Sequence, residues 1–391
     1  MPCKTEFLTT ENIEATVQDL QINPYTLVVA EESPEFKGEL IFQPLQGEQI
    51  FYEQYQDWLS RYLILNQPFV LVDFVEQLEK DGYTVLFMKS CQHILDGYER
   101  WRKPLEINGF HAPGGGNLYP YQTFSLNRAL ERIDAPDAPD RTYFVGWCPG
   151  AGKSVFACAG AQEAINRGQV DLVLAFTLMK LKTNLSNFFQ ANTSLQTVVN
   201  DGPAAKRKAR YENGSQVFVL NYDKAWADFE YLLPLVTGKR VLFILDEAQK
   251  VLTDGSPNRS RKHLDKLIQA SQPVIWPMSA TVVSHSPFKY RDVFSIGGFR
   301  RNPLGTKADF EIRYAKRRRF FEIRTKSGGK FQQIFYDWDL PKLHEIRHRV
   351  ADRCHNVRKT DPGIKENFKG MQTVVIPVQM SKEDRELYDL V

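Results

Sequence analysis

Residues 150–154, GAGKS, are the part of the sequence best suited to bind phosphate. Gly150 and Gly152, with Ala151 between them, allow backbone N–H groups to close around phosphate oxygens. Lys153 can reach the β and γ phosphates, and the Ser154 hydroxyl can bind magnesium. An apolar strand precedes this segment and a helical stretch ending near residue 168 follows it. The pattern therefore predicts a nucleotide-binding loop between a strand and a helix.

Trp147 stands where such a loop usually begins with glycine or another small residue. We therefore expect only residues 150–154 to surround phosphate. The sequence leaves two places open for the Trp147 ring, which either packs under the loop or lies near the adenine.

Asp246 and Glu247 follow the apolar run VLFIL and are the second element of the predicted site. Two carboxylates at the end of a buried strand need a cation or solvent, because burying an unpaired charge is costly. We expect Asp246 to hold magnesium through water and Glu247 to orient and deprotonate the attacking water. The alternative is that the two acids simply begin a surface loop.

The elements that must position these residues begin after residues 111–120, HAPGGGNLYP. Near-continuous apolar strands, YFVGW, DLVLAF, QVFVL, RVLFILDE and PVIWPMSA, alternate there with helical stretches. Such runs are typical of strands that are covered on both faces. We predict an α/β fold with a doubly wound, mostly parallel sheet over residues 113–391, preceded by a small α/β (α+β) module over residues 1–112.

Charge divides the chain near the same place. Residues 1–115 hold 8 Lys/Arg and 18 Asp/Glu, whereas residues 300–370 hold 19 Lys/Arg and 9 Asp/Glu. The basic region has the character of a surface that binds a phosphate backbone, although a solvated basic face would look the same. The acidic module is expected to engage a protein partner or substrate; covering the basic region and adding solubility are its alternatives.

Several classes of protein are excluded by pattern. The 5 cysteines are scattered without CxxC spacing, and no histidine has a partner at zinc spacing. No GxSxG elbow is present, no stretch is long enough to span a membrane, and the N-terminus lacks a signal peptide. We expect reduced thiols and a cytosolic location, in a bacterium or in a cell infected by a virus.

Four segments, LYPYQ (118–122), GAGKS (150–154), DEAQ (246–249) and MSAT (278–281), occur in the order and spacing of superfamily-two helicases. The chain resembles this group over residues 116–391. CHNVRKTDPGI and the following TVVIPVQMSKEDRELYDLV resemble the end of the first lobe in Swi/Snf-type double-stranded DNA translocases. LKTNLSNFF (181–189), VVNDGPAAKRKARY (198–211), VFVLNYDKAW (217–226) and ADFEIRYAK (308–316) also fit that type.

The resemblance implies a first RecA-like lobe that binds ATP and magnesium and acts on double-stranded DNA. Gln122 would read the adenine edge, and Lys153 would take part in catalysis beside Glu247. The residues that would face nucleic acid are Lys180, Lys182, Asn184, Lys206, Arg207, Ser279 and Thr281, with Arg317, Arg318 and Arg319 as the strongest charge run. Contacts to phosphates do not read bases, so little sequence specificity is expected.

Two departures and one missing part qualify the resemblance. Gln249 replaces the more usual histidine of DEAH, and Val282 follows SAT where many relatives have proline. The second lobe and its arginine motif are missing, so we expect a truncated chain, or the first half of a longer product, with weak ATPase activity on its own. A strand-separating DNA or RNA helicase and a nucleotide-regulated DNA-binding module without turnover remain the alternatives.

Overall fold

The computed structural model describes residues 25, 27–34, 40–59, 68–134, 141–253, 257–281, 286–298, 302–324, 330–343 and 345–359. A seven-stranded sheet forms the centre of the main domain. Its strand order is β12-β4-β9-β8-β5-β7-β6, and every pair in it is parallel. Its strands are β4 (Phe144–Trp147), β5 (Leu172–Thr177), β6 (Thr197–Val199), β7 (Val217–Asn221), β8 (Arg240–Asp246), β9 (Gln272–Met278) and β12 (Cys354–Val357).

The central strands are buried on both faces because their apolar residues alternate between two cores. On β8, Leu242 and Ile244 belong to one core, whereas Val241, Phe243 and Leu245 belong to the other. This explains the near-continuous apolar runs of the sequence. The predicted doubly wound, parallel α/β sheet is confirmed.

Helices cover each face of the sheet. The first core is closed by α5 (Pro120–Asp134), α6 (Lys153–Asn166) and α7 (Lys182–Asn192). The second is closed by α10 (Phe229–Val236), α11 (Arg259–Ala270), α12 (Pro287–Val293) and α13 (Lys307–Tyr314). The short helices α8 (Ala204–Tyr211) and α9 (Lys224–Ala227) lie near β6 and β7, and 3-10 turns occur at Lys89–Cys91, Pro113–Gly115, Met179–Leu181, Ala248–Lys250 and Ala351–Arg353.

Close approach of α6 to the sheet depends on small residues in that helix. A Cβ atom on Gly160 would lie 2.4 Å from the ring of Trp276 on β9. The space that glycine leaves is therefore filled by a large aromatic side chain. This packing holds the middle of α6 close to β9.

The N-terminal module has its own small core. Its sheet has the order β2-β1-β3, formed by β1 (Leu27–Glu32), β2 (Leu40–Pro44) and β3 (Thr84–Phe87), with β1 antiparallel to β2 and parallel to β3. The helices α2 (Glu48–Leu59), α3 (Pro68–Lys80) and α4 (Gln92–Arg102) accompany it. Phe124 of α5 belongs to this core, so the module is docked on the main domain.

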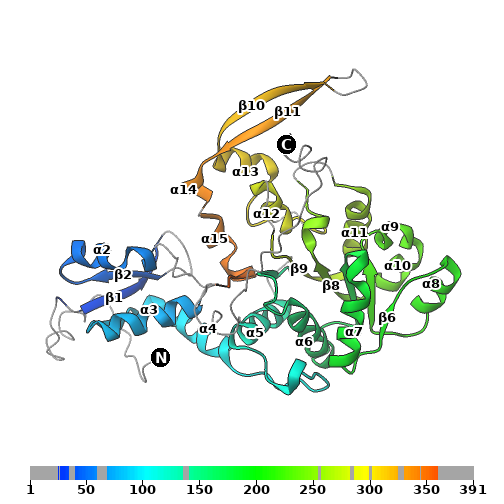
Figure 1. Ribbon diagram of the computed structural model, residues 1–391, viewed down its shortest axis with the longest axis horizontal. Helices are drawn as coiled ribbons and strands as arrows, with labels where there is room; N and C mark the ends of the chain where they lie inside the picture. Colours follow the sequence, from blue (N-terminus) through cyan, green and yellow to red (C-terminus); the bar gives the residue numbers. More distant parts are fainter. Residues whose placement is uncertain are drawn as a thin grey trace, which may run out of the picture.

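An insertion lies between β9 and β12. It contains α12, α13, the antiparallel hairpin of β10 (Ala315–Arg324) and β11 (Lys330–Trp338), and the short helices α14 (Leu340–Leu343) and α15 (Glu345–Arg349). The hairpin projects from the domain at the top of Figure 1. The sequence did not lead us to expect this hairpin.

Two other expectations bear on the fold. Within the described ranges, no helix is long and apolar enough to cross a membrane. Val282, one of the two departures from the resemblance, lies outside the described residues, as does the segment beyond residue 359, which carries part of the resemblance.

Candidate nucleotide-binding site

The predicted phosphate loop lies between β4 and α6, as its sequence context requires. Gly150 and Gly152 have φ angles of 85° and 84°, in the left-handed region that favours glycine. Gly152 is the N-cap of α6, so Lys153 and Ser154 begin the helix. Backbone N–H groups at a helix N-terminus attract anions. The loop therefore has the conformation that phosphate binding needs.

Gln122 lies against this loop, although the two are 30 residues apart in sequence. Its amide donates to the carbonyl oxygen of Ala151 over 3.1 Å, and its own oxygen accepts from the Tyr119 N–H over 3.0 Å. A Cβ atom on Gly152 would meet the Gln122 nitrogen at 2.4 Å. The start of α5 and the phosphate loop thus form one unit, with the Tyr121 hydroxyl also donating to Ala151 over 2.8 Å.

Lys153 follows β4 and Asp246 ends β8, and only β9 lies between these two strands. Val145 of β4 and Asp246 of β8 are both paired with Met278 of β9. The Lys153 ammonium donates to the carbonyl oxygen of Trp147 over 3.0 Å, and its charge acts on the carboxyl group of Asp246. The phosphate loop and the acid pair therefore lie at the same edge of the sheet.

Asp246 occupies a buried position. Its carboxylate accepts from the Thr177 hydroxyl over 2.8 Å, and its backbone oxygen accepts from the Tyr222 hydroxyl over 2.7 Å. Burial raises the pKa of Asp246 above its usual value, Glu247 raises it further, and Thr177 and Lys153 act in the opposite direction. A cation beside this carboxylate would offset the cost of its charge.

Glu247 has φ 51° and is the only non-glycine residue with positive φ in the described part of the chain. Strained backbone of this kind is often found at functional sites. Gln249 donates to the Glu247 carboxylate over 2.6 Å and accepts from the Ser279 hydroxyl over 2.6 Å. Ser279 in turn accepts from the Thr281 N–H over 3.1 Å. Gln249, at the histidine position, thus connects two motifs.

The Trp147 ring packs under the loop and is fully buried. Its centroid lies 5.3 Å from Tyr121 and 5.4 Å from Phe156, both at edge-to-face angles. Of the two positions that the sequence left open, the structure has the first. The residue acts as part of the core that supports the loop.

The residues predicted to face nucleic acid differ in exposure. Lys180, Asn184, Lys206 and Thr281 are exposed, whereas Ser279 is buried in the chain of hydrogen bonds to Glu247. Lys208 and the run Arg317, Arg318 and Arg319 are also exposed.

Two of the predicted nucleic-acid residues are engaged within the protein. Lys182 is 1% exposed and forms an ion pair with Asp201. Arg207 binds the fully buried carboxylate of Asp228, with its Nε atom 3.0 Å from both oxygens. Their charges are satisfied internally, so we no longer include these two side chains in the nucleic-acid surface.

The donor set fits a magnesium nucleotide. Magnesium is usually held by one or two carboxylates together with substrate phosphates, and not by a cage of protein ligands. No group of three or more His, Cys, Asp or Glu side chains that could hold a metal ion occurs in the described ranges. Asp246 and Ser154 are the residues that could hold the metal, and Lys153 is the residue that could hold the phosphates.

Thr177, Tyr222 and Tyr121 also belong to the site, although the sequence did not lead us to assign them to it. Thr177 and Tyr222 lie at the ends of β5 and β7, where polar residues follow apolar runs. Because the carboxyl ends of parallel strands share one edge, that position was an available signal. Tyr121 is adjacent to Gln122 and carried no signal of its own.

The chain was compared with protein families, with curated proteins and with solved structures. Residues 116–284 match the family described as "Type III restriction enzyme, res subunit". A search of the curated proteins finds no match.

Three solved structures are similar to part of the chain at low sequence identity. The Swi2/Snf2 ATPase core of Sulfolobus solfataricus in complex with double-stranded DNA is 16% identical, with a TM-score of 0.49 over 67% of this chain and 48% of that one. A second structure of the Sulfolobus core domain is 16% identical, with a TM-score of 0.46 over 68% and 47%. The Hef helicase domain of Pyrococcus furiosus is 15% identical, with a TM-score of 0.36 over 46% and 36%.

The chain spans about half the length of the Sulfolobus chains. The family match begins just before Gln122 and ends just after Thr281, so it includes the phosphate loop, the acid pair and the residues connected to them. The candidate site thus lies within the part of the chain that is similar to this family.

Proposed function

We propose that the chain carries the ATP-binding lobe of a Swi/Snf-type translocase that moves along double-stranded DNA. The observation that carries the proposal is the meeting of the phosphate loop and the acid pair at one sheet edge, where the charge of Lys153 acts on Asp246. The family match over residues 116–284 and the exposed basic residues Lys180 and Lys206 support the proposal further.

Each residue of the site has a proposed role. Backbone N–H groups of residues 150–154 and the Lys153 ammonium would bind the phosphates, and Gln122 would recognise the adenine. When bound, magnesium would neutralise phosphate charge and align the terminal phosphate. Glu247 would accept a proton from the attacking water, and its hydrogen bond with Gln249 would hold it in place.

The connection from Glu247 through Gln249 to Ser279 and Thr281 suggests how hydrolysis would be coupled to DNA. Residues 246–249 and residues 278–281 would shift together when the charge of the nucleotide beside Glu247 changes. A second lobe, which we propose as the partner of this one, would close over the nucleotide and supply an arginine to the developing phosphate charge.

The first test is Glu247→Gln in the full-length protein. Removal of the base should lower the ATPase rate about 10²- to 10⁴-fold. Affinity for ATP should stay close to that of the wild type, because the phosphate loop is intact. Glu212→Gln, at an exposed acid outside the site, is the matched control. Turnover at the wild-type rate would show that another group is the base.

The second test separates translocation from strand separation and from a switch without turnover. Displacement of a third strand from duplex DNA, without release of a labelled duplex strand, would support a translocase. Release of that strand would indicate a helicase. ATP binding without any duplex-stimulated hydrolysis would indicate a nucleotide-regulated binding module.

A further inference from the structure

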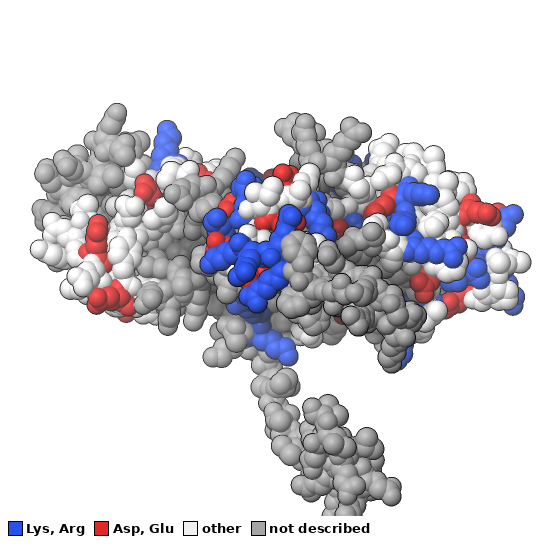
Figure 2. Space-filling view, turned by 90° about the horizontal axis from the view of Figure 1, so that it is seen from above, with Lys and Arg blue, Asp and Glu red and all other residues white. Residues whose placement is uncertain are grey.

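The β10–β11 hairpin concentrates positive charge on a projecting element. Residues 315–338 hold 7 Lys/Arg and 2 Asp/Glu, a net of +5, whereas the whole chain has a net of +3. All other residues together therefore carry a net of −2. Viewed from above, Lys and Arg side chains gather near the middle of the surface, over the region from which the hairpin rises (Figure 2).

An aromatic cluster anchors the base of the hairpin. The rings of Tyr336 and Trp338 each lie 5.0 Å from that of Phe288, and Trp338 lies 6.0 Å from Phe310. An isolated two-stranded hairpin is marginally stable in water. Packing on α12 and α13 therefore sets the direction in which the hairpin projects.

The two faces of the hairpin differ in what their charges contact. On the face toward α13, Arg318 pairs with Glu311, and Tyr336 opposite Arg318 donates to Glu311 over 3.4 Å. Successive residues of a strand point to opposite faces, so Arg317 and Arg319 lie on the outer face. Both are exposed.

Asp337 is the acidic residue of the outer face. It lies directly opposite Arg317, and it pairs with Arg319 at 2.7 Å with 40% of its side chain exposed. The carboxylate of Asp337 thus pairs with Arg319, while Arg317 lies beside it on the same face. The outer face keeps a positive charge that no contact within the described hairpin balances.

We propose that the outer face of the β10–β11 hairpin binds the phosphate backbone of duplex DNA. This contact would be separate from the residues at the carboxyl edge of the sheet that the sequence predicts to face nucleic acid. The inference rests on the proposed function. The 10 residues of β10 span roughly 33 Å at about 3.3 Å per residue. This length matches about ten base pairs at about 3.4 Å each, and a two-stranded ribbon fits the major groove.

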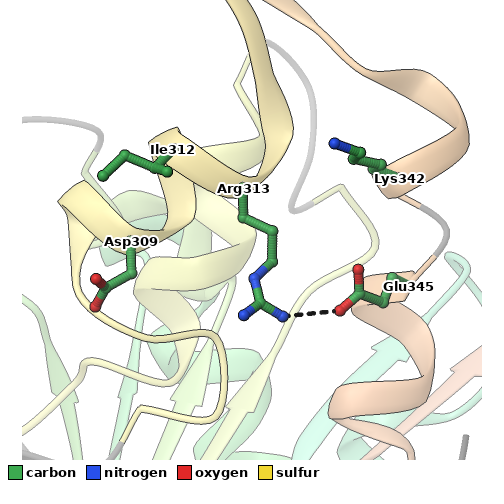
Figure 3. Close-up of a pocket in the computed structure, with 5 residues that line it drawn as sticks. All are labelled: Asp309, Ile312, Arg313, Lys342 and Glu345. Carbon is green, nitrogen blue, oxygen red and sulfur yellow. Dashed lines mark hydrogen bonds and ion pairs between the residues drawn. The ribbon is translucent and has the colours of Figure 1, made fainter. Parts of the chain in front are cut away.

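The cavity at the base of the hairpin is not part of this surface. It measures about 520 Å³ and is lined by Asp309, Ile312, Arg313, Lys342 and Glu345 (Figure 3). Arg313 points to Glu345 and pairs with it at 3.0 Å. Two acids balance two bases among its lining residues, so the cavity does not share the excess positive charge of the outer face.

The test compares two double variants of the full-length protein with equal loss of charge. Arg317→Ala/Arg319→Ala removes the outer arginines, and Lys262→Ala/Lys266→Ala removes two exposed lysines of α11. The first should weaken binding of a labelled duplex about tenfold and lower the slope of log affinity against log salt by about one per lost contact. The second should change both much less.

A gain of affinity provides the complementary measurement. Asp337→Asn removes the carboxylate, frees Arg319 and should tighten duplex binding by about threefold at low salt. A purely structural role of the Arg319–Asp337 pair predicts no gain. Thermal melting of each variant shows whether the fold is intact.

Two outcomes would overturn the hairpin surface: equal effects of the two double variants, or unchanged or weaker binding by Asp337→Asn. ATP hydrolysis stimulated by duplex in the wild type, measured in parallel, would leave the proposed function standing in that case. Lack of any such stimulation would instead count against the proposed function.

Discussion

Asp246 shows how a residue that we propose as a magnesium ligand carries a cost in stability. Burial raises its pKa, so between the ordinary value and the raised value the folded state holds a proton that the unfolded state has lost. The free energy of unfolding therefore falls as pH rises through that window, and the ionised carboxylate destabilises the fold. This is the behaviour expected of a position kept for cation binding.

Asp246→Asn should therefore melt at a higher temperature than the wild type at neutral pH, and the difference should shrink as pH falls. The asparagine oxygen can still accept from Thr177, which donates to Asp246 over 2.8 Å. Magnesium-dependent ATP binding should be lost at the same time. Melting followed by circular dichroism between pH 4 and pH 8, with Asp96→Asn as an exposed control, measures this. A less stable variant at neutral pH would mean that attraction to Lys153 outweighs desolvation.

Residue types predicted the candidate site better than they predicted its surroundings. The residue types and sequence context of Lys153 and Asp246 indicated a shared site, and in the structure both lie at the carboxyl edge of the sheet. Lys182 and Arg207 have the same side-chain types as DNA contacts, but Asp201 and Asp228 bind them internally. Folding brings these acids next to Lys182 and Arg207 from about 20 residues away in the sequence, so no local sequence pattern predicts the two ion pairs.

At the scale of elements, β12 joins the edge of the sheet to α5. His355 pairs with Val145 of β4 in the strand register, and its ring lies 5.4 Å from Phe124 and 6.0 Å from Trp147. The ring is buried, and its Nδ1 atom has no hydrogen-bond partner. Burial, with a smaller effect of Arg128, lowers the pKa of His355 to about 3.

This histidine should make the fold sensitive to acid. Between its ordinary pKa of 6.5 and about 3, the unfolded state binds a proton that the folded state does not. The free energy of unfolding should therefore decrease as pH falls through this range, by at most about 1.4 kcal/mol per pH unit. In His355→Leu that part of the dependence should vanish, and in His111→Gln, at an exposed position, it should remain. Denaturant unfolding at several pH values would show equal slopes in all three proteins if the inference is wrong.

The central elements were predictable because hydrophobic runs determine them. YFVGW, DLVLAF, QVFVL, RVLFILDE and PVIWPMSA became β4, β5, β7, β8 and β9. The β10–β11 hairpin was not predictable in this way, because β10 is rich in charged residues and its sequence indicates only a basic segment. Its strands are held by pairing with each other and by the aromatic anchor at Phe288, a contact between residues about 50 positions apart.

At the scale of the whole molecule, the N-terminal module and the main domain pack directly against each other. Trp101 of α4 lies 5.7 Å from Phe124 of α5, and Asn127 donates to the carbonyl oxygens of Trp101 and Lys103 over 2.8 and 2.9 Å. The glycines of the predicted linker do form an irregular turn, with Gly114 and Gly115 at positive φ. The packing of the chain on the main domain nevertheless begins before that turn.

Residues 105–111 are the segment on which the extent of the main domain can be tested. Leu105, Ile107 and Phe110 pack against the core beneath α6 and α7. The Gly109 carbonyl oxygen accepts from the Ser194 N–H over 2.8 Å, and His111 donates to Asn192 over 2.9 Å. A truncated protein that starts at residue 113 would lose all of these contacts, whereas one that starts at residue 104 would keep them.

We therefore expect the form starting at residue 104 to be the more stable of the two. Three partly buried apolar side chains are worth roughly 1 kcal/mol each, which corresponds to a melting temperature higher by about 5 to 10 °C. Both forms lose the N-terminal module and expose Phe124 equally, so the difference isolates residues 104–112. Calorimetry of the two forms, with ATP binding as a check on the nucleotide site, measures it. Equal melting temperatures would place the start of the independent domain at residue 113.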